Sequence, residues 1–223
     1  MTRLIVIGEG ATEQAFCKDI LEPHFLPDLI IHAVTIKKSR GGIVHWSFLK
    51  KQIEEHLKQD QSAYVTLFID YYGIKDQHEF PSWEAAQAIP GKSIRMDHLE
   101  GAMSHEITEG LRRRFIPYIQ LHETEGLLFS DKRVYDESFT QEEFDDYTYL
   151  EETFNQFDNP EEINDGPDTH PSKRLERILR DYTSNKPSTK AHWGPLIATE
   201  IGLPTIRRKC PRFNAWVEKL ENI

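Results

Sequence analysis

Five acidic side chains follow three apolar stretches of the chain, at spacings that could build a metal site. They are Glu9, Glu13, Asp70, Glu123 and Glu125. Several carboxylates gathered in one crevice repel one another by several kcal/mol unless a cation lies among them. Hard divalent cations prefer oxygen ligands, and no thiolate accompanies these acids, so the expected cofactor is Mg²⁺ or Mn²⁺. The alternative is that each acid is only a helix cap or a loop charge.

Buried strands are the elements that must position these acids. Apolar runs predict strands at residues 4–7, 29–36, 64–69 and 117–122. Helical periodicity predicts helices between Thr12 and Pro23 and at residues 46–57, 82–89 and 94–109. This alternation predicts an α/β fold with a mainly parallel sheet flanked by helices. Three of the strands end directly before acids, at the sheet edge where sites form.

The composition changes after residue 130. We expect residues 1–130 to form a Rossmannoid catalytic core, and residues 131–223 to form an acidic segment and a C-terminal helical cap packed on it as one unit. Residues 136–168 carry about 13 acidic side chains and no Lys or Arg. Two helices are expected at residues 172–182 and 212–220. The acidic segment is either a solvated face over buried aromatic side chains or a docking surface.

The formal charge of −10 argues against a simple cationic nucleic-acid binder. Two distant cysteines, Cys17 and Cys210, fit a reducing compartment. The first apolar run is too short for a signal peptide, and no stretch reaches the roughly 20 apolar residues of a membrane span. We therefore expect a cytoplasmic protein without a membrane partner.

Basic residues near the C-terminus could hold a phosphate. Lys173 and Arg174 follow Ser172 at the expected start of a helix, where backbone N–H groups favour an anion. Arg207 and Arg208 form a second cluster that could follow a nucleic-acid backbone. The alternative in both cases is solvated surface charge.

Several other kinds of site are excluded or weak. The pair Gly8-x-Gly10 after a strand lacks the third glycine of a dinucleotide fingerprint, and no GxxxxGK[ST] loop or HExxH zinc pattern occurs. His122 precedes Glu123 in the strand expected at residues 117–122, so we expect it on the opposite face, in the core or behind a ligand.

Three short strings resemble the acidic motifs of Toprim-like domains. They are Gly-Glu-Gly-Ala-Thr-Glu at residues 8–13, Phe-Ile-Asp-Tyr-Tyr-Gly at 68–73 and His-Glu-Thr-Glu-Gly-Leu-Leu at 122–128. With the tail strings at residues 171–175, 201–203 and 210–213, nearly the whole chain resembles a bacterial Toprim-like family of unknown function. That family is related to the Toprim nuclease domains of OLD-type nucleases and is often encoded beside an ATPase of the ABC or AAA type.

This resemblance implies a Toprim-like core and a metal-dependent endonuclease that hydrolyses phosphodiester bonds of DNA or RNA. Glu9 would be a ligand or general acid/base, Glu13 a further ligand and Asp70 the main ligand. Glu123 would be both a metal ligand and a catalytic residue, Glu125 would be a further metal ligand, and Lys173 would be a catalytic residue. Tyr72 stands where the usual Asp-x-Asp motif has its second aspartate, which leaves one or two metals open. Glu123, Glu125 or Asp76 could supply the missing oxygen.

The resemblance also implies a role as an effector in bacterial antiphage defence, working with an ATPase partner, and it leaves a homo-oligomer open. Two other functions remain. One is a catalytically degenerate Toprim module that binds a partner protein or nucleic acid. The other is a hydrolase of small phosphates that uses the same metal chemistry.

Overall fold

A parallel sheet forms the centre of the molecule. The computed structural model describes residues 2–39, 42–164, 166, 168–183 and 187–223. Its strands are β1 (Thr2–Gly8), β2 (Leu29–Thr35), β3 (Ala63–Asp70), β4 (Phe115–Ile116) and β5 (Ile119–Gln120). They pair in the order β2-β1-β3-β4, with β5 also beside β3, and every pairing is parallel. The predicted α/β class with a mainly parallel sheet is confirmed.

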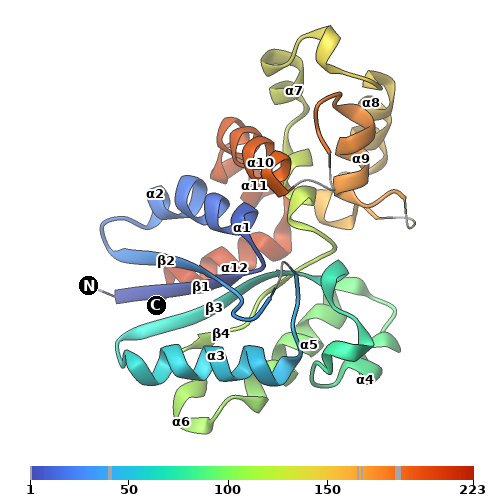
Figure 1. Cartoon of the computed structure of the whole chain (residues 1–223). Coiled ribbons are helices and arrows are strands. Elements are labelled where there is room, and N and C mark those ends of the chain that lie inside the picture. The colour runs from blue at the N-terminus through green and yellow to red at the C-terminus, as the bar shows by residue number, and fades with distance from the viewer. Residues whose placement is uncertain (1, 40–41, 165, 167, 184–186) are drawn as a thin grey trace.

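Helices cover both faces of the sheet (Figure 1). One face carries α3 (Trp46–Gln59), α5 (Lys92–Glu106), the short α4 (Trp83–Gln87) and α6 (Glu109–Arg112). The other carries α1 (Ala11–Phe16), α2 (Glu22–Phe25) and α12 (Pro211–Glu221). Successive strand side chains point to opposite faces, so Leu67 and Phe68 of β3 belong to two separate buried clusters.

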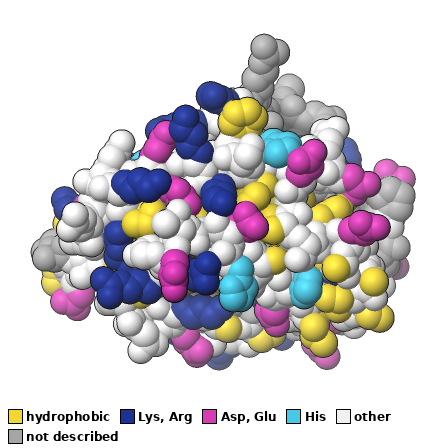
Figure 2. All heavy atoms as spheres, turned by 90° about the horizontal axis from the view of Figure 1, so that it is seen from below, with side chains coloured by type: hydrophobic (Ala, Val, Ile, Leu, Met, Phe, Trp, Pro, Cys, Tyr) yellow, Lys and Arg dark blue, Asp and Glu magenta, His cyan; other side chains and the backbone are white. Residues whose placement is uncertain are grey.

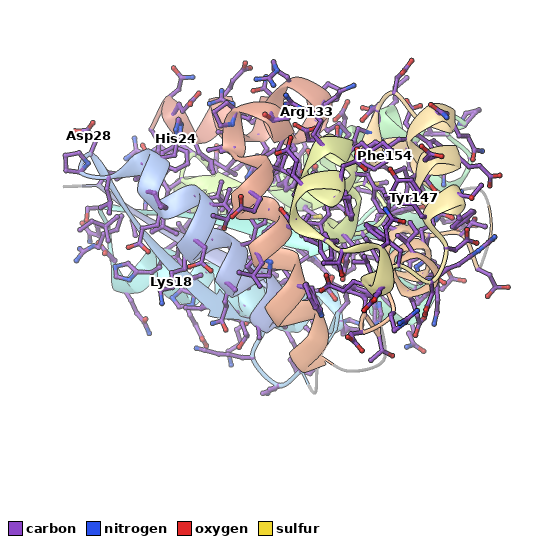
Figure 3. The ribbon with its side chains drawn as sticks, turned by 90° about the horizontal axis from the view of Figure 1, so that it is seen from above. Lys18, His24, Asp28, Arg133, Tyr147 and Phe154 are labelled. Carbon is purple, nitrogen blue, oxygen red and sulfur yellow. The ribbon has the colours of Figure 1, made fainter. Side chains whose placement is uncertain are left out.

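The remaining helices form the predicted C-terminal helical region. They are α7 (Lys132–Ser138), α8 (Tyr147–Gln156), α9 (Pro171–Ile178), α10 (Pro187–Ile201) and α11 (Leu203–Lys209). Seen from above, α10 lies between α1 and α7 (Figure 3). In this view Arg133 marks α7, and Tyr147 and Phe154 mark α8, on the far side of α7 from α10. Helix α10 thus connects the helical region to the helices on the sheet.

The last helix packs deep against the sheet. The indole ring of Trp216 on α12 stacks on Tyr118, with ring centroids 4.5 Å apart, and on Phe68 of β3 at 5.2 Å. Its Nε1 donates to Thr66 Oγ1 at 2.9 Å, and Thr66 Oγ1 donates to the carbonyl of Ile116 at 2.6 Å. One buried cluster therefore joins residues from both ends of the chain.

Tertiary contacts offset part of the charge segregation seen along the sequence. Asp145 and Asp146 of the acidic segment pair with Arg180 and Arg177, which follow it in the chain. Aromatic side chains of the same segment pack toward the core, and Phe144 is buried. On the face formed by α3, α5 and α6, basic and acidic side chains are interspersed (Figure 2). Within the described ranges, no helix has the length and apolar character needed to cross a bilayer.

Two local expectations were wrong. Pro23 does not end the first helix, because a π-helical turn, Cys17–Leu21, carries the chain into α2, where proline occupies the first turn and needs no N–H partner. Of the strand expected at residues 117–122, only Ile119–Gln120 is a strand (β5), and β4 lies before that range at Phe115–Ile116. His122 lies outside both, with a φ of 65°, so it does not alternate with Glu123 across a strand.

A buried carboxyl on α5 should make stability depend on pH. Glu100 accepts from Arg212 at 2.6 Å and from the backbone N–H of Ile119 at 2.9 Å, yet burial raises its pKa from 4.5 to about 7. Between these two values the native state keeps a proton that the unfolded chain loses. The unfolding free energy should therefore fall as pH rises through this window, by up to about 1.4 kcal/mol per pH unit from this group.

The measurement is urea unfolding from pH 4.5 to 8 for the wild type and Glu100→Gln, which stays neutral throughout. The difference between the two curves isolates Glu100, and it should grow in favour of the variant up to about pH 7 and then level off. Parallel curves would contradict the raised pKa.

Candidate functional site

Three strands deliver the acidic side chains to one edge of the sheet. Glu9 follows β1, Asp70 is the last residue of β3, and Glu123 lies three residues after β5. Because these strands are parallel, their carboxyl ends lie on the same side of the sheet. The backbone links two of the ends, since the N–H of Tyr72 donates to the carbonyl of His122 at 3.0 Å.

Asp70 occupies the centre of this edge. The backbone N–H and the hydroxyl of Thr124 both donate to its Oδ1, at 2.9 and 2.8 Å. Its own backbone N–H donates to Glu9 Oε1 at 2.7 Å. A Cβ at Gly73 would lie 3.3 Å from Glu9 Oε2, so the missing side chain makes room for this carboxylate. Asp70 and Glu9 are thereby held side by side.

Glu13 reaches the same edge from the first turn of α1. Its Oε2 accepts from the backbone N–H of Gly10 at 2.7 Å, and the side chain is buried. A Cβ at Gly8 would lie 2.6 Å from the Cβ of Glu13, a distance that real contacts do not reach. Gly8 is therefore needed for the close passage of α1 over the end of β1.

Glu123 is fixed by the start of α9. Its Oε2 accepts from the backbone N–H of Ser172 at 2.8 Å and contacts His170 Nδ1 at 3.0 Å, while the Ser172 hydroxyl donates to Oε1 at 3.1 Å. The N-terminus of α9, which we expected to bind phosphate, thus holds the chain's own carboxylate. Glu125 is also buried, and the hydroxyl of Tyr182 contacts its Oε1 at 3.4 Å.

The electrostatics of Asp70 show that all five acids come together. Burial raises the pKa of Asp70 well above its usual range, and the charges of Glu9, Glu125, Glu13 and Glu123 raise it further. Negative charge is therefore in excess at this edge. The carboxylate oxygens of these acids are donors that suit Mg²⁺ or Mn²⁺, whose positive charge would relieve the repulsion that raises the pKa of Asp70.

The acids are not arranged as a finished ligand set. In the described part of the chain, no three His, Cys, Asp or Glu side chains converge as metal ligands. The hydrogen bonds explain this arrangement, because oxygens of Glu9, Glu13, Asp70 and Glu123 are turned toward backbone N–H groups. Within the described residues, no donor contacts Asp70 Oδ2.

Most of the basic residues expected to hold phosphate are occupied within the fold. Lys173 pairs with Glu176 on the same helix. Arg174 is buried, donating to the carbonyl of Thr169 at 2.8 Å and to the hydroxyl of Thr153 at 3.0 Å. Arg207 pairs with Glu221, and Arg208 donates to the carbonyl of Pro204 at 3.3 Å.

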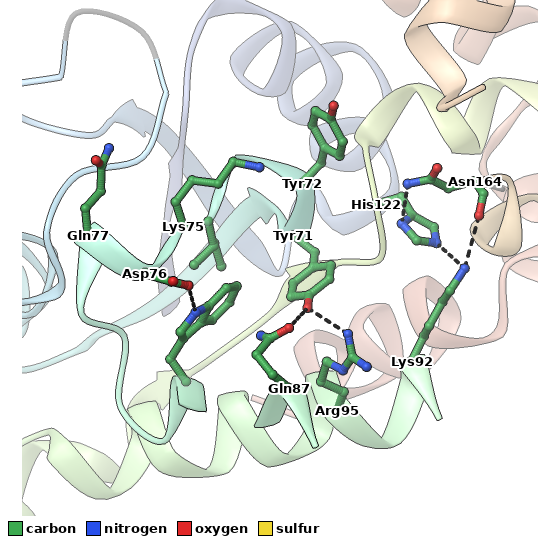
Figure 4. Close-up of a pocket in the computed structure, with 12 residues that line it drawn as sticks. Tyr71, Tyr72, Lys75, Asp76, Gln77, Gln87, Lys92, Arg95, His122 and Asn164 are labelled. Carbon is green, nitrogen blue, oxygen red and sulfur yellow. Dashed lines mark hydrogen bonds between the residues drawn. The ribbon is translucent and has the colours of Figure 1, made fainter. Parts of the chain in front are cut away.

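Sequence reasoning missed a pocket of about 570 Å³ beside the acids (Figure 4). We call it the Lys92 pocket, and its lining includes Tyr71, Lys75, Trp83, Lys92, Arg95 and His122. Burial and the charge of Lys92 lower the pKa of His122 to about 4, so this ring is neutral at pH 7. The available signal was the pair of tyrosines directly after Asp70.

Tyr72 stacks on His170, with ring centroids 4.6 Å apart. It therefore connects the end of β3 to the residue before α9, and no carboxylate stands at this position. Asp76, another candidate for the missing oxygen, lines the Lys92 pocket, where its Oδ1 accepts from Trp83 Nε1 at 2.6 Å.

Comparison with known proteins gives one family. The model of a domain of unknown function, DUF4276, matches residues 8–221 and so covers all five acids and the Lys92 pocket. Neither the search of curated proteins nor that of solved structures gives a match.

Proposed function

The chain belongs to the DUF4276 family, whose description assigns no function, and we propose from the chemistry of its own residues that it is a Mg²⁺- or Mn²⁺-dependent nuclease. The reaction would be hydrolysis of phosphodiester bonds in DNA or RNA. The observation that carries this proposal is Asp70, whose pKa is raised by burial and by four neighbouring carboxylates at the end of a parallel strand. The likeness of the three acidic motifs to Toprim nucleases points to the same chemistry.

Each acid would have a distinct task. Asp70 would bind the cation through Oδ2 while Thr124 holds Oδ1, and Glu9 beside it would be a second oxygen ligand or would accept a proton from the attacking water. Glu13 and Glu125 would complete the negative charge around the ion. Glu123 would act from its fixed position at α9. A bound divalent cation would supply positive charge for the phosphate and for its leaving oxygen.

Divalent cations should therefore stabilise the protein in a pH-dependent manner. At about 100 times its dissociation constant, a ligand adds about 2.7 kcal/mol, which for a chain of this size raises Tm by about 5–10 °C. Since the pKa of Asp70 is raised, protons compete with the cation as pH falls. We expect Mn²⁺ and Mg²⁺ to raise Tm at pH 8 and to have little effect at pH 5. Differential scanning fluorimetry measures the shift in Tm, and calorimetry measures the affinity of the protein for the metal ion.

The matched control is Glu55→Gln, which removes a partly exposed carboxylate of α3 that pairs with Lys37 and is not one of the five acids. Its metal-induced shift should equal that of the wild type. Equal shifts at pH 5 and pH 8, or no shift at millimolar metal, would refute the carboxylate site.

The biological setting remains part of the proposal. We propose that the chain acts in the cytoplasm as an effector of bacterial antiphage defence, licensed by an ABC- or AAA-type ATPase. The two cysteines fit a reducing compartment, since both are buried and free. The test is co-purification with candidate ATPases followed by cleavage assays with and without ATP.

One observation favours a second function. Tyr72 replaces the second aspartate of the usual motif, and its ring stacks on His170 instead of presenting an oxygen. A degenerate Toprim module that binds a partner protein or nucleic acid without cleaving it would have this arrangement. Absence of metal binding in the experiment above would favour it.

A further inference from the structure

The lining of the Lys92 pocket contains three cations, Lys75, Lys92 and Arg95. Lys92 Nζ contacts His122 Nε2 at 3.1 Å and the carbonyl of Asn164 at 3.2 Å (Figure 4). The Arg95 guanidinium donates to the carbonyl of Ile89 at 2.8 Å and to the hydroxyl of Tyr71 at 3.0 Å. Lys75 Nζ lies 4.7 Å from the ring centroid of Tyr72. Among the described residues, none of the three makes an ion pair with a carboxylate.

This arrangement differs from that of the other basic residues considered above. Lys173 and Arg207 pair with Glu176 and Glu221, whereas the cations of the pocket have no carboxylate partner among the described residues. The only acid in the pocket's described lining is Asp76, which accepts from Trp83. The protein has a formal charge of −10, so a local excess of positive charge in one pocket indicates an anion-binding site.

The pocket also presents aromatic rings. Tyr71 and Trp83 are partly exposed and lie 5.8 Å apart between centroids, and Tyr72 is 38% exposed. The pocket volume of about 570 Å³ lies within the range of sites that bind small ligands. Proteins that bind unpaired nucleotides combine cationic side chains, which contact the phosphates, with aromatic rings, on which the bases stack. Unpaired bases can do this because they are not stacked inside a duplex.

The pocket and the acids share the same two loops. Tyr71 and Tyr72 directly follow Asp70, and His122 directly precedes Glu123. We propose that the Lys92 pocket binds a nucleotide of single-stranded nucleic acid, its base against the rings and the phosphates on either side of it on Lys92 and on Lys75, so that a neighbouring phosphodiester faces the acids. This inference rests on the proposed function and names its substrate class. A duplex is not the ligand, because its bases are stacked on one another.

Binding without metal tests the pocket separately from the nuclease. Labelled single-stranded DNA, single-stranded RNA and duplexes of both are titrated by fluorescence anisotropy in EDTA at several salt concentrations. We expect the wild type to bind single strands more tightly than duplexes. The double variant Lys75→Gln/Lys92→Gln should bind at least about tenfold more weakly, and its slope of log K against log salt should be smaller by about 1.4. Comparison of the DNA and RNA arms identifies the sugar preference.

The control is Lys51→Gln/Lys58→Gln on α3, which changes the net charge equally at two exposed positions. It should bind like the wild type. A second readout is the fluorescence of Trp83, which a stacked base should quench in the wild type and not in Trp83→Phe. Trp83→Leu should lose about fivefold to a hundredfold in affinity.

Three results would overturn the proposal: no binding of any single strand, an equal loss in both double variants, or a preference for duplex. The metal-induced Tm shift is measured on the same variants. A normal metal shift with no strand binding refutes the pocket alone, whereas strand binding through Lys75 and Lys92 without metal binding refutes the nuclease and leaves a binding module.

Discussion

Replacing Asp70 with asparagine should abolish metal-dependent cleavage and, at the same time, stabilise the metal-free protein. Asparagine keeps an oxygen that can accept from Thr124, so the local hydrogen bonds survive while the charge is lost. Mutation of a residue that only hydrogen-bonds to a metal ligand lowers metal affinity or activity by about 10–100-fold. Asp70 would be a ligand itself, so its loss should cost more. We expect cleavage of single-stranded substrate to fall by more than about 100-fold, and the metal-induced rise in Tm to disappear.

The gain in stability follows from the raised pKa of Asp70. As pH rises above the usual range of an aspartate, the unfolded chain loses this proton before the native state does, so the native state loses stability. Each unit of raised pKa corresponds to about 1.4 kcal/mol, and the variant avoids this cost. Urea unfolding in EDTA should therefore show Asp70→Asn to be more stable than the wild type at pH 8, and equally stable near pH 4.

Asp145→Asn is the matched control, because it makes the same chemical change at an exposed ion pair with Arg180 that contributes little. It should leave cleavage, metal binding and stability unchanged within error. If Asp70→Asn instead kept its cleavage activity, the assignment of Asp70 would fail. If it were destabilised at pH 8, the excess of negative charge at this edge would be disproved.

Replacing Trp216 with alanine should cause the largest loss of stability. The indole is 1% exposed, stacks on Tyr118 and Phe68, and donates to Thr66. Truncation of a buried Trp costs about 3–5 kcal/mol, a large share of the roughly 5–15 kcal/mol that stabilises a domain. We expect Tm to fall by about 6–20 °C, and urea unfolding should show one transition for both parts of the chain.

Ile94→Ala serves as the control, because this side chain is 65% exposed and its truncation should change stability by less than about 0.5 kcal/mol. Below its own Tm, Trp216→Ala should still show a metal-induced shift, since α12 contributes none of the five acids. A loss below about 1 kcal/mol would mean that α12 does not pack on the sheet, and two separate transitions would mean that the residues before and after 130 unfold independently.

The sequence by itself determined the α/β class and the positions of the acids at strand ends. Apolar runs such as residues 64–69 are stable only when they are buried. Because helical segments separate these runs along the chain, the strands are expected to be parallel. Glu9 and Asp70 each follow such a run directly, so their arrival at one edge needs no knowledge of distant contacts. Local patterning was less successful after Leu128, where α7, α8, α10 and α11 were not individually predicted.

Only the tertiary structure decided which charges remain available for chemistry. Ser172 and Lys173 opened a helix as expected, but Glu123, 49 residues earlier than Ser172, occupies that N-terminus. Lys92 was unremarkable in the sequence, yet the fold sets it against two neutral acceptors, from His122 and Asn164. Periodicity reports which face of an element is buried, whereas the partner of a charge depends on contacts between distant segments, and these exist only once the chain has folded.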